Sequence, residues 1–147
     1  RDSLINFRPT TGGTFRVQIL DANGRGDVGP NYLYTFTASG TLVSTSTPTV
    51  VATATSSTVT PTPIPCQDSY EPDDSRDMAH PIELNTTSQR HSLCPVGDVD
   101  WVTFTAGGGK VYTMFTSDLR GPTDTLITLY DAQGHFLAEN DDYQPGS

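Results

Sequence analysis

The chain has 147 residues, about the size of one domain. Eight basic and 17 acidic residues give a formal net charge of -9, so the basic surface that nucleic-acid binding requires is missing. No apolar run approaches the roughly 20 residues of a membrane span. We therefore expect neither a nucleic-acid partner nor a membrane span.

Three short segments near the start are rich in β-forming residues and predict strands over residues 4–7, 14–20 and 32–37. In the second segment, Phe15, Val17 and Ile19 alternate with polar residues. This period of two is typical of a sheet with one face toward solvent. The front of the chain is therefore expected to supply part of a sheet.

Residues 41–65 have the composition of a linker. About half of them are Ser or Thr, and none has a large side chain to bury. The prolines at its far end favour an extended, polyproline-like backbone. The hydroxyl groups indicate either O-glycosylation, as in mucin-like stalks, or a bare flexible tether. The candidate O-glycosylation residues are Thr45, Thr47, Thr49, Thr53, Thr55, Thr58, Thr60 and Thr62.

The same β pattern returns after the linker and predicts five more strands, over residues 89–93, 101–105, 111–116, 126–130 and 135–138. Residues 74–79 allow one helical turn at most, because Pro72 precedes them and Pro81 ends them. No segment has a sustained helical period. We expect an all-β chain, in which Trp101 packs in the core or between sheets.

Four motifs follow one another in the rear part of the chain: DSYEPDDS at residues 68–75, GDVDWVTF at 97–104, DTLITLYD at 124–131 and LAENDD at 137–142. Together and in this order they resemble the bacterial pre-peptidase C-terminal domain, a secreted β-sandwich related to the collagen-binding domains of clostridial collagenases. The resemblance implies an antiparallel, jelly-roll-like β-sandwich and an extracellular or cell-surface location.

The closing strands of that family do not follow residue 147, but residues 1–40 resemble them. The resemblance therefore divides the chain into the C-terminal half of such a sandwich (1–40), the linker (41–65) and its N-terminal part (66–147). Each half alone would leave unpaired backbone groups and an uncovered apolar face. Either residues 1–40 fold back on residues 66–147 of the same chain, or a neighbouring copy completes each half and builds an open filament or tandem array.

We favour completion by neighbouring copies, because the chain begins and ends inside a domain, as a window cut from a repeat would. An arbitrary fragment of a multidomain secreted protein is the alternative. The expected function is a non-catalytic extracellular structural module whose partners are identical copies. The alternative function is a calcium-dependent appendage of a secreted peptidase or adhesin that binds collagen, another protein or a polysaccharide in the extracellular matrix or on the cell surface.

Carboxylates gather in two loops of the rear part, and their oxygens are ligands that suit Ca²⁺. Like charges brought together at a sheet end repel one another unless a cation neutralises them. The resemblance implies calcium ligation by Glu71, Asp73, Asp74, Asp98 and Asp100. A second oxygen-rich site, or a set of Asx turns with similar composition, is expected at Asp124, Asn140, Asp141 and Asp142.

The chain has two cysteines, Cys66 and Cys94. In a secreted acidic β-domain we expect them to form a disulfide, with two free thiols in a reducing compartment as the alternative. A zinc site is disfavoured, since no histidine lies at ligand spacing from either cysteine.

A catalytic role is not expected. The three histidines lie in separate segments, and no nucleophile elbow or His-Glu-x-x-His pair occurs. Asn85 begins an Asn-Thr-Thr sequon and is a candidate for N-glycosylation in a host that modifies exported proteins in this way.

Overall fold

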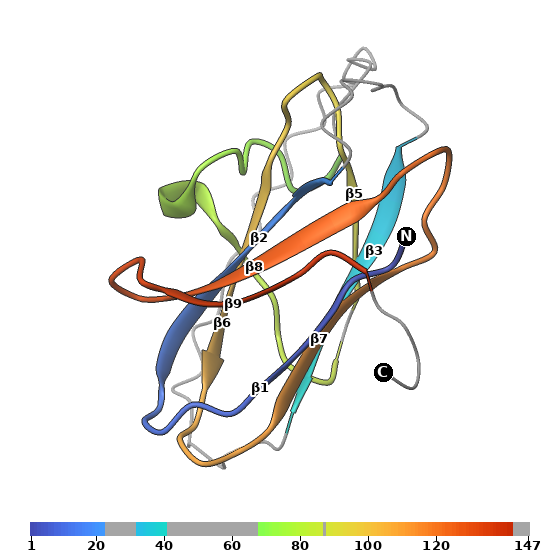
Figure 1. Ribbon diagram of the computed structural model, residues 1–147. Helices are drawn as coiled ribbons and strands as arrows, with labels where there is room; N and C mark the ends of the chain where they lie inside the picture. The colour runs from blue at the N-terminus through green and yellow to red at the C-terminus, as the bar shows by residue number, and fades with distance from the viewer. Residues whose placement is uncertain (23–31, 41–67, 87, 143–147) are drawn as a thin grey trace.

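The computed structural model describes residues 1–22, 32–40, 68–86 and 88–142 (Figure 1). These residues form β1 (Leu4–Phe7), β2 (Gly13–Asp21), β3 (Leu33–Gly40), the 3₁₀ turn η1 (Arg76–Met78), β4 (His80–Pro81), β5 (Gln89–Ser92), β6 (Asp100–Ala106), β7 (Tyr112–Ser117), β8 (Thr125–Asp131) and β9 (Phe136–Asn140). The eight predicted strands and the single helical turn are confirmed. The two-residue strand β4 was not predicted. Residues 41–65, with the candidate O-glycosylation sites, lie outside the described residues.

The strands form two sheets that pack against each other as a β-sandwich, which confirms the predicted fold class. One sheet has the order β1-β7-β3-β5, and the other has the order β4-β6-β2-β8-β9. Every pair is antiparallel except β4–β6, which is parallel. Within the described residues, no helix has the length and apolar character needed to span a membrane.

Strands from the front of the chain occupy central positions in both sheets. β2 lies between β6 and β8, where Val17 is opposite Val102 on one side and Leu129 on the other. β3 lies between β5 and β7, and β1 pairs with β7 at the sheet edge. In this single chain, the sandwich is thus completed by the chain's own front strands, which is the first of the two solutions expected from the sequence.

The core lies between the sheets and follows from the strand period of two. Val17 and Ile19 on β2 are fully buried, as are Ile127 and Leu129 on β8, and they pack with Phe36 of the other sheet in one hydrophobic cluster. Burial of each such side chain contributes about 1.5–3 kcal/mol relative to leaving it in water. The alternation predicted for β2 is therefore confirmed.

Trp101 is buried, as expected, but it does not belong to the cluster between the sheets. Val102 and Phe104 of β6 point into the core, so Trp101 lies on the opposite face of this strand. It is buried there against Tyr130 of β8, with ring centroids 5.4 Å apart. Asp100 shares the inner face with Val102, and this position is what brings a carboxylate between the sheets.

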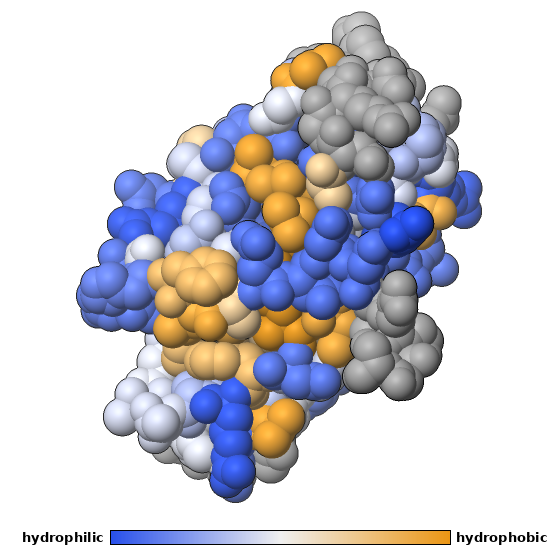
Figure 2. Space-filling model, viewed as in Figure 1, coloured by the Kyte–Doolittle hydropathy of each residue, from blue (hydrophilic) through white to orange (hydrophobic). Residues whose placement is uncertain are grey.

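One surface of the molecule exposes apolar side chains along a sheet edge. On the face shown in Figure 2, hydrophobic residues gather over the region where β1, β8 and β9 run in Figure 1. Phe136 of the edge strand β9 is 61 % exposed, and Leu137 is 38 % exposed. Phe7, Phe15 and Leu137 line a shallow hollow on the surface of the sandwich.

Candidate metal centre

The candidate site lies between the two sheets, where inward-facing polar residues replace apolar ones. Asp100 begins β6 on its inner face, and His91 takes the inner face of β5 in the opposite sheet. Tyr34 on β3 is the register partner of His91. All three side chains are fully buried. The Tyr34 hydroxyl donates a short hydrogen bond to Asp100 Oδ2, which ties the two sheets together at this point.

A tight turn places Asp98 beside this group. The amide of Asp98 donates to the carbonyl of Pro95 (3.0 Å), and Gly97 has φ 85°, a conformation that glycine adopts without strain. The Asp98 carboxylate then accepts hydrogen bonds from the amides of Cys94 (2.5 Å) and Val99 (3.0 Å). These bonds hold the side chain inward, and Asp98 is buried.

The acidic loop that precedes η1 is held against β6 by its backbone. The amide of Trp101 donates to the carbonyl of Asp73 (3.1 Å), which brings this loop to the start of β6. The amide of Asp73 donates to Glu71 Oε2 (3.2 Å). Asp73 is fully buried, whereas Asp74 is exposed. The loop thus supplies one inward and one outward carboxylate.

The structure brings together all five carboxylates that the sequence predicted for the first calcium site. Their ligand oxygens form two groups of three, each with atoms within 4.8 Å of one another: Glu71, Asp74 and Asp98 on the outer side, and Glu71, Asp73 and Asp100 further in. Glu71 belongs to both groups. Within the described residues, no lysine or arginine forms an ion pair with any of these carboxylates.

Burial without a counter-charge changes the acidity of this cluster. Burial, with the nearby negative charge of Glu71, raises the pKa of Asp73 to about 8. Burial raises the pKa of Asp98 to about 7 and holds the pKa of Asp100 well above its usual range. Neither oxygen of Asp73 and only one oxygen of Asp100 has a hydrogen-bond partner in the described part of the chain. A buried acceptor without a partner costs free energy, and a cation would supply the missing interactions.

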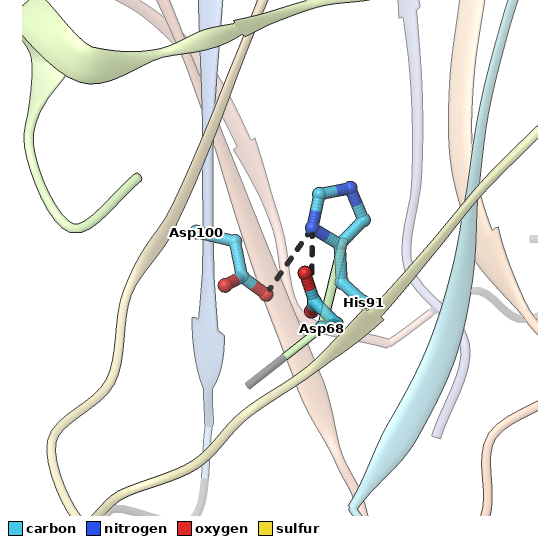
Figure 3. A group of neighbouring side chains, drawn as sticks. All are labelled: Asp68, His91 and Asp100. Atoms are coloured by element: carbon cyan, nitrogen blue, oxygen red, sulfur yellow. Dashed lines mark ion pairs between the residues drawn. The ribbon is translucent and has the colours of Figure 1, made fainter. Parts of the chain in front are cut away.

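Sequence reasoning missed the inner end of the cluster, which is formed by His91 and Asp68. His91 Nδ1 lies 3.7 Å from Asp73 Oδ2, 3.9 Å from Asp68 Oδ2 and 4.0 Å from Asp100 Oδ2. Figure 3 shows the His91 ring directed at the carboxylates of Asp68 and Asp100, which come from different segments of the fold. Burial lowers the pKa of His91 to about 4. The alternation in residues 89–93 would place His91 inward, but no sequence signal gives its register against Asp100.

The second predicted cluster is built differently. Carboxylate oxygens of Asp124, Asp141 and Asp142 lie within 4.8 Å of one another, near the surface. The α-amino group of Arg1 lies 2.8 Å from Asp124 Oδ1, and the Arg1 guanidinium lies 2.5 Å from Asp142 Oδ2. Asn140 Oδ1, the fourth predicted ligand, accepts a hydrogen bond from the amide of Leu4 (2.9 Å).

The remaining predicted sites are described only in part. Cys94 is fully buried, and the described part of the chain has no free cysteine thiol. Cys66 lies outside the described residues, so the disulfide stays a prediction. The side chain of Asn85 exchanges two hydrogen bonds with the backbone of Gly40, at 2.8 and 2.6 Å. Thr87 lies outside the described residues, so the sequon also stays a prediction.

Carboxylates converge between the sheets, and no lysine or arginine of the described residues forms an ion pair with them, so this arrangement can hold a divalent cation. No family model, curated protein or solved structure matches the chain.

Proposed function

We propose that the chain is a non-catalytic extracellular structural module that calcium stabilises and that assembles with identical copies. The observation that carries the proposal is the convergence of buried carboxylates between the sheets, which form no ion pair with a lysine or arginine in the described part of the chain. The sequence resemblance to a secreted β-sandwich domain supports the extracellular location. The buried Cys94, which carries no free thiol, fits an oxidising compartment.

Calcium is the cation that best fits the outer group of this cluster. Glu71, Asp74 and Asp98 offer only oxygen ligands, from two loops. Calcium takes six to eight oxygens at about 2.3–2.6 Å in flexible geometry, and water can supply those that the protein does not. The cluster at Asp124, Asp141 and Asp142 is not proposed as a calcium site, because the Arg1 guanidinium already lies against it.

Titration calorimetry with CaCl₂ tests this assignment on the full chain, freed of metal with a chelator. We expect saturable binding by the wild type and loss of binding in Asp98→Asn, which keeps the side-chain shape but removes the charge. Asp142→Asn is the matched control and should bind as the wild type does. Equal binding by Asp98→Asn and the wild type would reject the site.

Assembly with identical copies is supported by the position of the front strands. Strands β2 and β3 complete the two sheets. The chain connects them to the rear strands through residues 41–67, which lie outside the described residues. The strands that pair with β2 and β3 have the same sequence in every copy. The front strands of a neighbouring copy could therefore pair with them in the same way as the chain's own front strands do. Exchange of this segment would link copies head to tail without any new type of contact.

A pair of introduced cysteines distinguishes exchange from self-completion. Arg16 and Thr103 are register partners on β2 and β6. In the double variant Arg16→Cys/Thr103→Cys, a disulfide would link two different chains if the front strands are exchanged between copies. If each chain completes its own sheets, the disulfide would lie within one chain. We expect a ladder of covalent multimers on a non-reducing gel, and the single variants Arg16→Cys and Thr103→Cys control for crosslinks through the native cysteines. Only internally bonded monomer at every protein concentration would contradict the proposal.

A further inference from the structure

The inner end of the cluster differs chemically from the outer end, because it contains a nitrogen ligand. Ligand atoms of Asp68, His91 and Asp100 lie within 4.8 Å of one another, and all face the space between the sheets. We propose that these three residues form a second cation site, separate from the outer calcium site, which binds a divalent transition-metal ion such as Zn²⁺, Mn²⁺ or Co²⁺.

The hydrogen bonds of Gln89 determine which nitrogen of His91 carries the lone pair. Gln89 Nε2 donates to the carbonyl of Pro81 (2.9 Å), so the amide oxygen Oε1 is turned toward His91. His91 Nε2 lies 3.3 Å from this oxygen and therefore carries the proton that it donates. The lone pair is then on Nδ1, which points at the carboxylates. A metal-bound histidine is commonly held in this way, with its other nitrogen donating to an oxygen of the protein.

The distances around Nδ1 suit coordination of a cation better than a hydrogen bond. Its distances to the oxygens of Asp68, Asp73 and Asp100, from 3.7 to 4.0 Å, are too long for hydrogen bonds. Nδ1 has no hydrogen-bond partner among the described residues, although His91 is fully buried. Two ligands bound at about 2.1 Å to one tetrahedral metal ion lie about 3.4 Å apart, so shifts of a few tenths of an ångström would bring Nδ1 to this spacing from each of the three oxygens.

The His91 ring is held in this orientation by two aromatic neighbours. Tyr34 stacks on it with ring centroids 5.4 Å apart, and Tyr70 stacks with centroids 4.5 Å apart. The Tyr34 hydroxyl also donates to Asp100, which positions a second ligand. A ligand set whose orientation is fixed before the ion arrives loses little conformational entropy on binding.

The nitrogen ligand gives the inner site its metal preference. Imidazole suits zinc, cobalt and other transition metals, whereas calcium takes oxygen ligands almost exclusively. The inner site uses Asp68 and His91, which the outer group of Glu71, Asp74 and Asp98 does not contain. The inference therefore does not rest on the proposed calcium site, and the two can be tested separately.

The test is a Co²⁺ titration of the metal-free full chain, followed by visible absorption and by electron paramagnetic resonance sensitive to nitrogen ligation. We expect one Co²⁺ ion bound with a histidine-nitrogen signature and displaced by Zn²⁺ but not by an equal concentration of Ca²⁺. His91→Gln should lose the nitrogen signature and weaken Co²⁺ binding by at least about tenfold, while calcium binding at the outer site is kept. The exposed His135→Gln is the matched control.

Asp68→Asn keeps the test decisive if His91→Gln does not fold, because it removes a ligand charge at a partly exposed position. This variant should also weaken Co²⁺ binding by at least about tenfold. Absence of Co²⁺ binding by the wild type, a spectrum with oxygen ligands alone, or unchanged Co²⁺ affinity in Asp68→Asn would each overturn the proposal. If the wild type binds Co²⁺ but not Ca²⁺, the proposed calcium site is rejected, whereas the inner site is supported.

Discussion

Two acidic clusters in this molecule look alike in sequence but differ in surroundings. Each brings at least three carboxylates within 4.8 Å of one another. The cluster between the sheets includes Asp73 and Asp100, which are fully buried and form no ion pair with a lysine or arginine of the described residues. The surface cluster includes Asp142, whose carboxylate pairs with the Arg1 guanidinium. Burial and the position of one cation, rather than the number of carboxylates, distinguish the cluster for which we propose a metal ion from the one for which we do not.

The largest effect that should separate the two clusters is the response of stability to calcium. Calcium at about a hundredfold excess over its Kd adds about 2.7 kcal/mol to the folded state, which corresponds to a rise in Tm of about 10 °C for a domain of this size. We expect this rise in the wild type and in Asp142→Asn by differential scanning calorimetry, and its loss in Asp98→Asn. Equal melting temperatures in calcium and in chelator would remove the distinction between the clusters.

A second difference should appear in the dependence of stability on pH without metal. The pKa of Asp73 is about 8 and that of Asp98 is about 7 in the folded chain, both above the unfolded value of about 3.9. The folded state therefore keeps protons that the unfolded state loses, and this stabilisation is full below about pH 4 and disappears as the pH rises through about 7 to 8. We expect the Tm in chelator to fall between about pH 5 and pH 8.5.

The same pH series in saturating calcium should show the opposite trend, because calcium binds the deprotonated carboxylates and its affinity rises as they lose their protons. Asp142→Asn should follow the wild type in both series. A Tm in chelator that stays constant or rises over this range would show that the buried carboxylates do not have raised pKa values.

Asp73→Asn is expected to change the Tm by a smaller amount, and in opposite directions in chelator and in calcium. The asparagine stays neutral at about pH 8.5, where Asp73 carries charge in a buried position. In chelator at this pH the variant should therefore melt above the wild type. In calcium it should melt below the wild type, since the variant lacks the negative charge that Asp73 places beside Glu71, a ligand of the outer group. A change of the same sign in both conditions, measured by thermal denaturation, would contradict this effect of the Asp73 charge.

The smallest effect is expected at the surface cluster. Asp142→Asn breaks the contact with the Arg1 guanidinium, which is exposed to solvent and screened by salt. We expect a fall in Tm of no more than about 2 °C at low ionic strength, and none at about 1 M salt. A fall as large as the calcium effect would show that this cluster is structurally as important as the buried one.

The strands could be predicted from sequence because their alternation is local. Phe15, Val17 and Ile19 already show which face of β2 enters the core. Strand β4 was missed because it consists of His80 and Pro81 alone, and proline is unfavourable within a strand. Two-residue strands do not produce a detectable period.

Five carboxylates of the cluster could be predicted because they lie within two short motifs, at residues 71–74 and 98–100. Asp68 and His91 could not, because they come from other segments and meet Asp100 only through the packing of one sheet on the other. The pairing of Arg1 with Asp142 was missed for the same reason. Contacts between distant segments depend on register, and a single sequence does not give the register between two sheets.

The central position of β2 and β3 also has a consequence for how the chain folds. The partners of β2 are distant in sequence: Val17 is 85 residues from Val102 and 112 residues from Leu129. Closing such long loops costs chain entropy before any ladder bond forms, so folding should be slow compared with that of a domain built from neighbouring hairpins. Neither the front nor the rear part of the chain should therefore fold independently, and both should fold and unfold in a single transition.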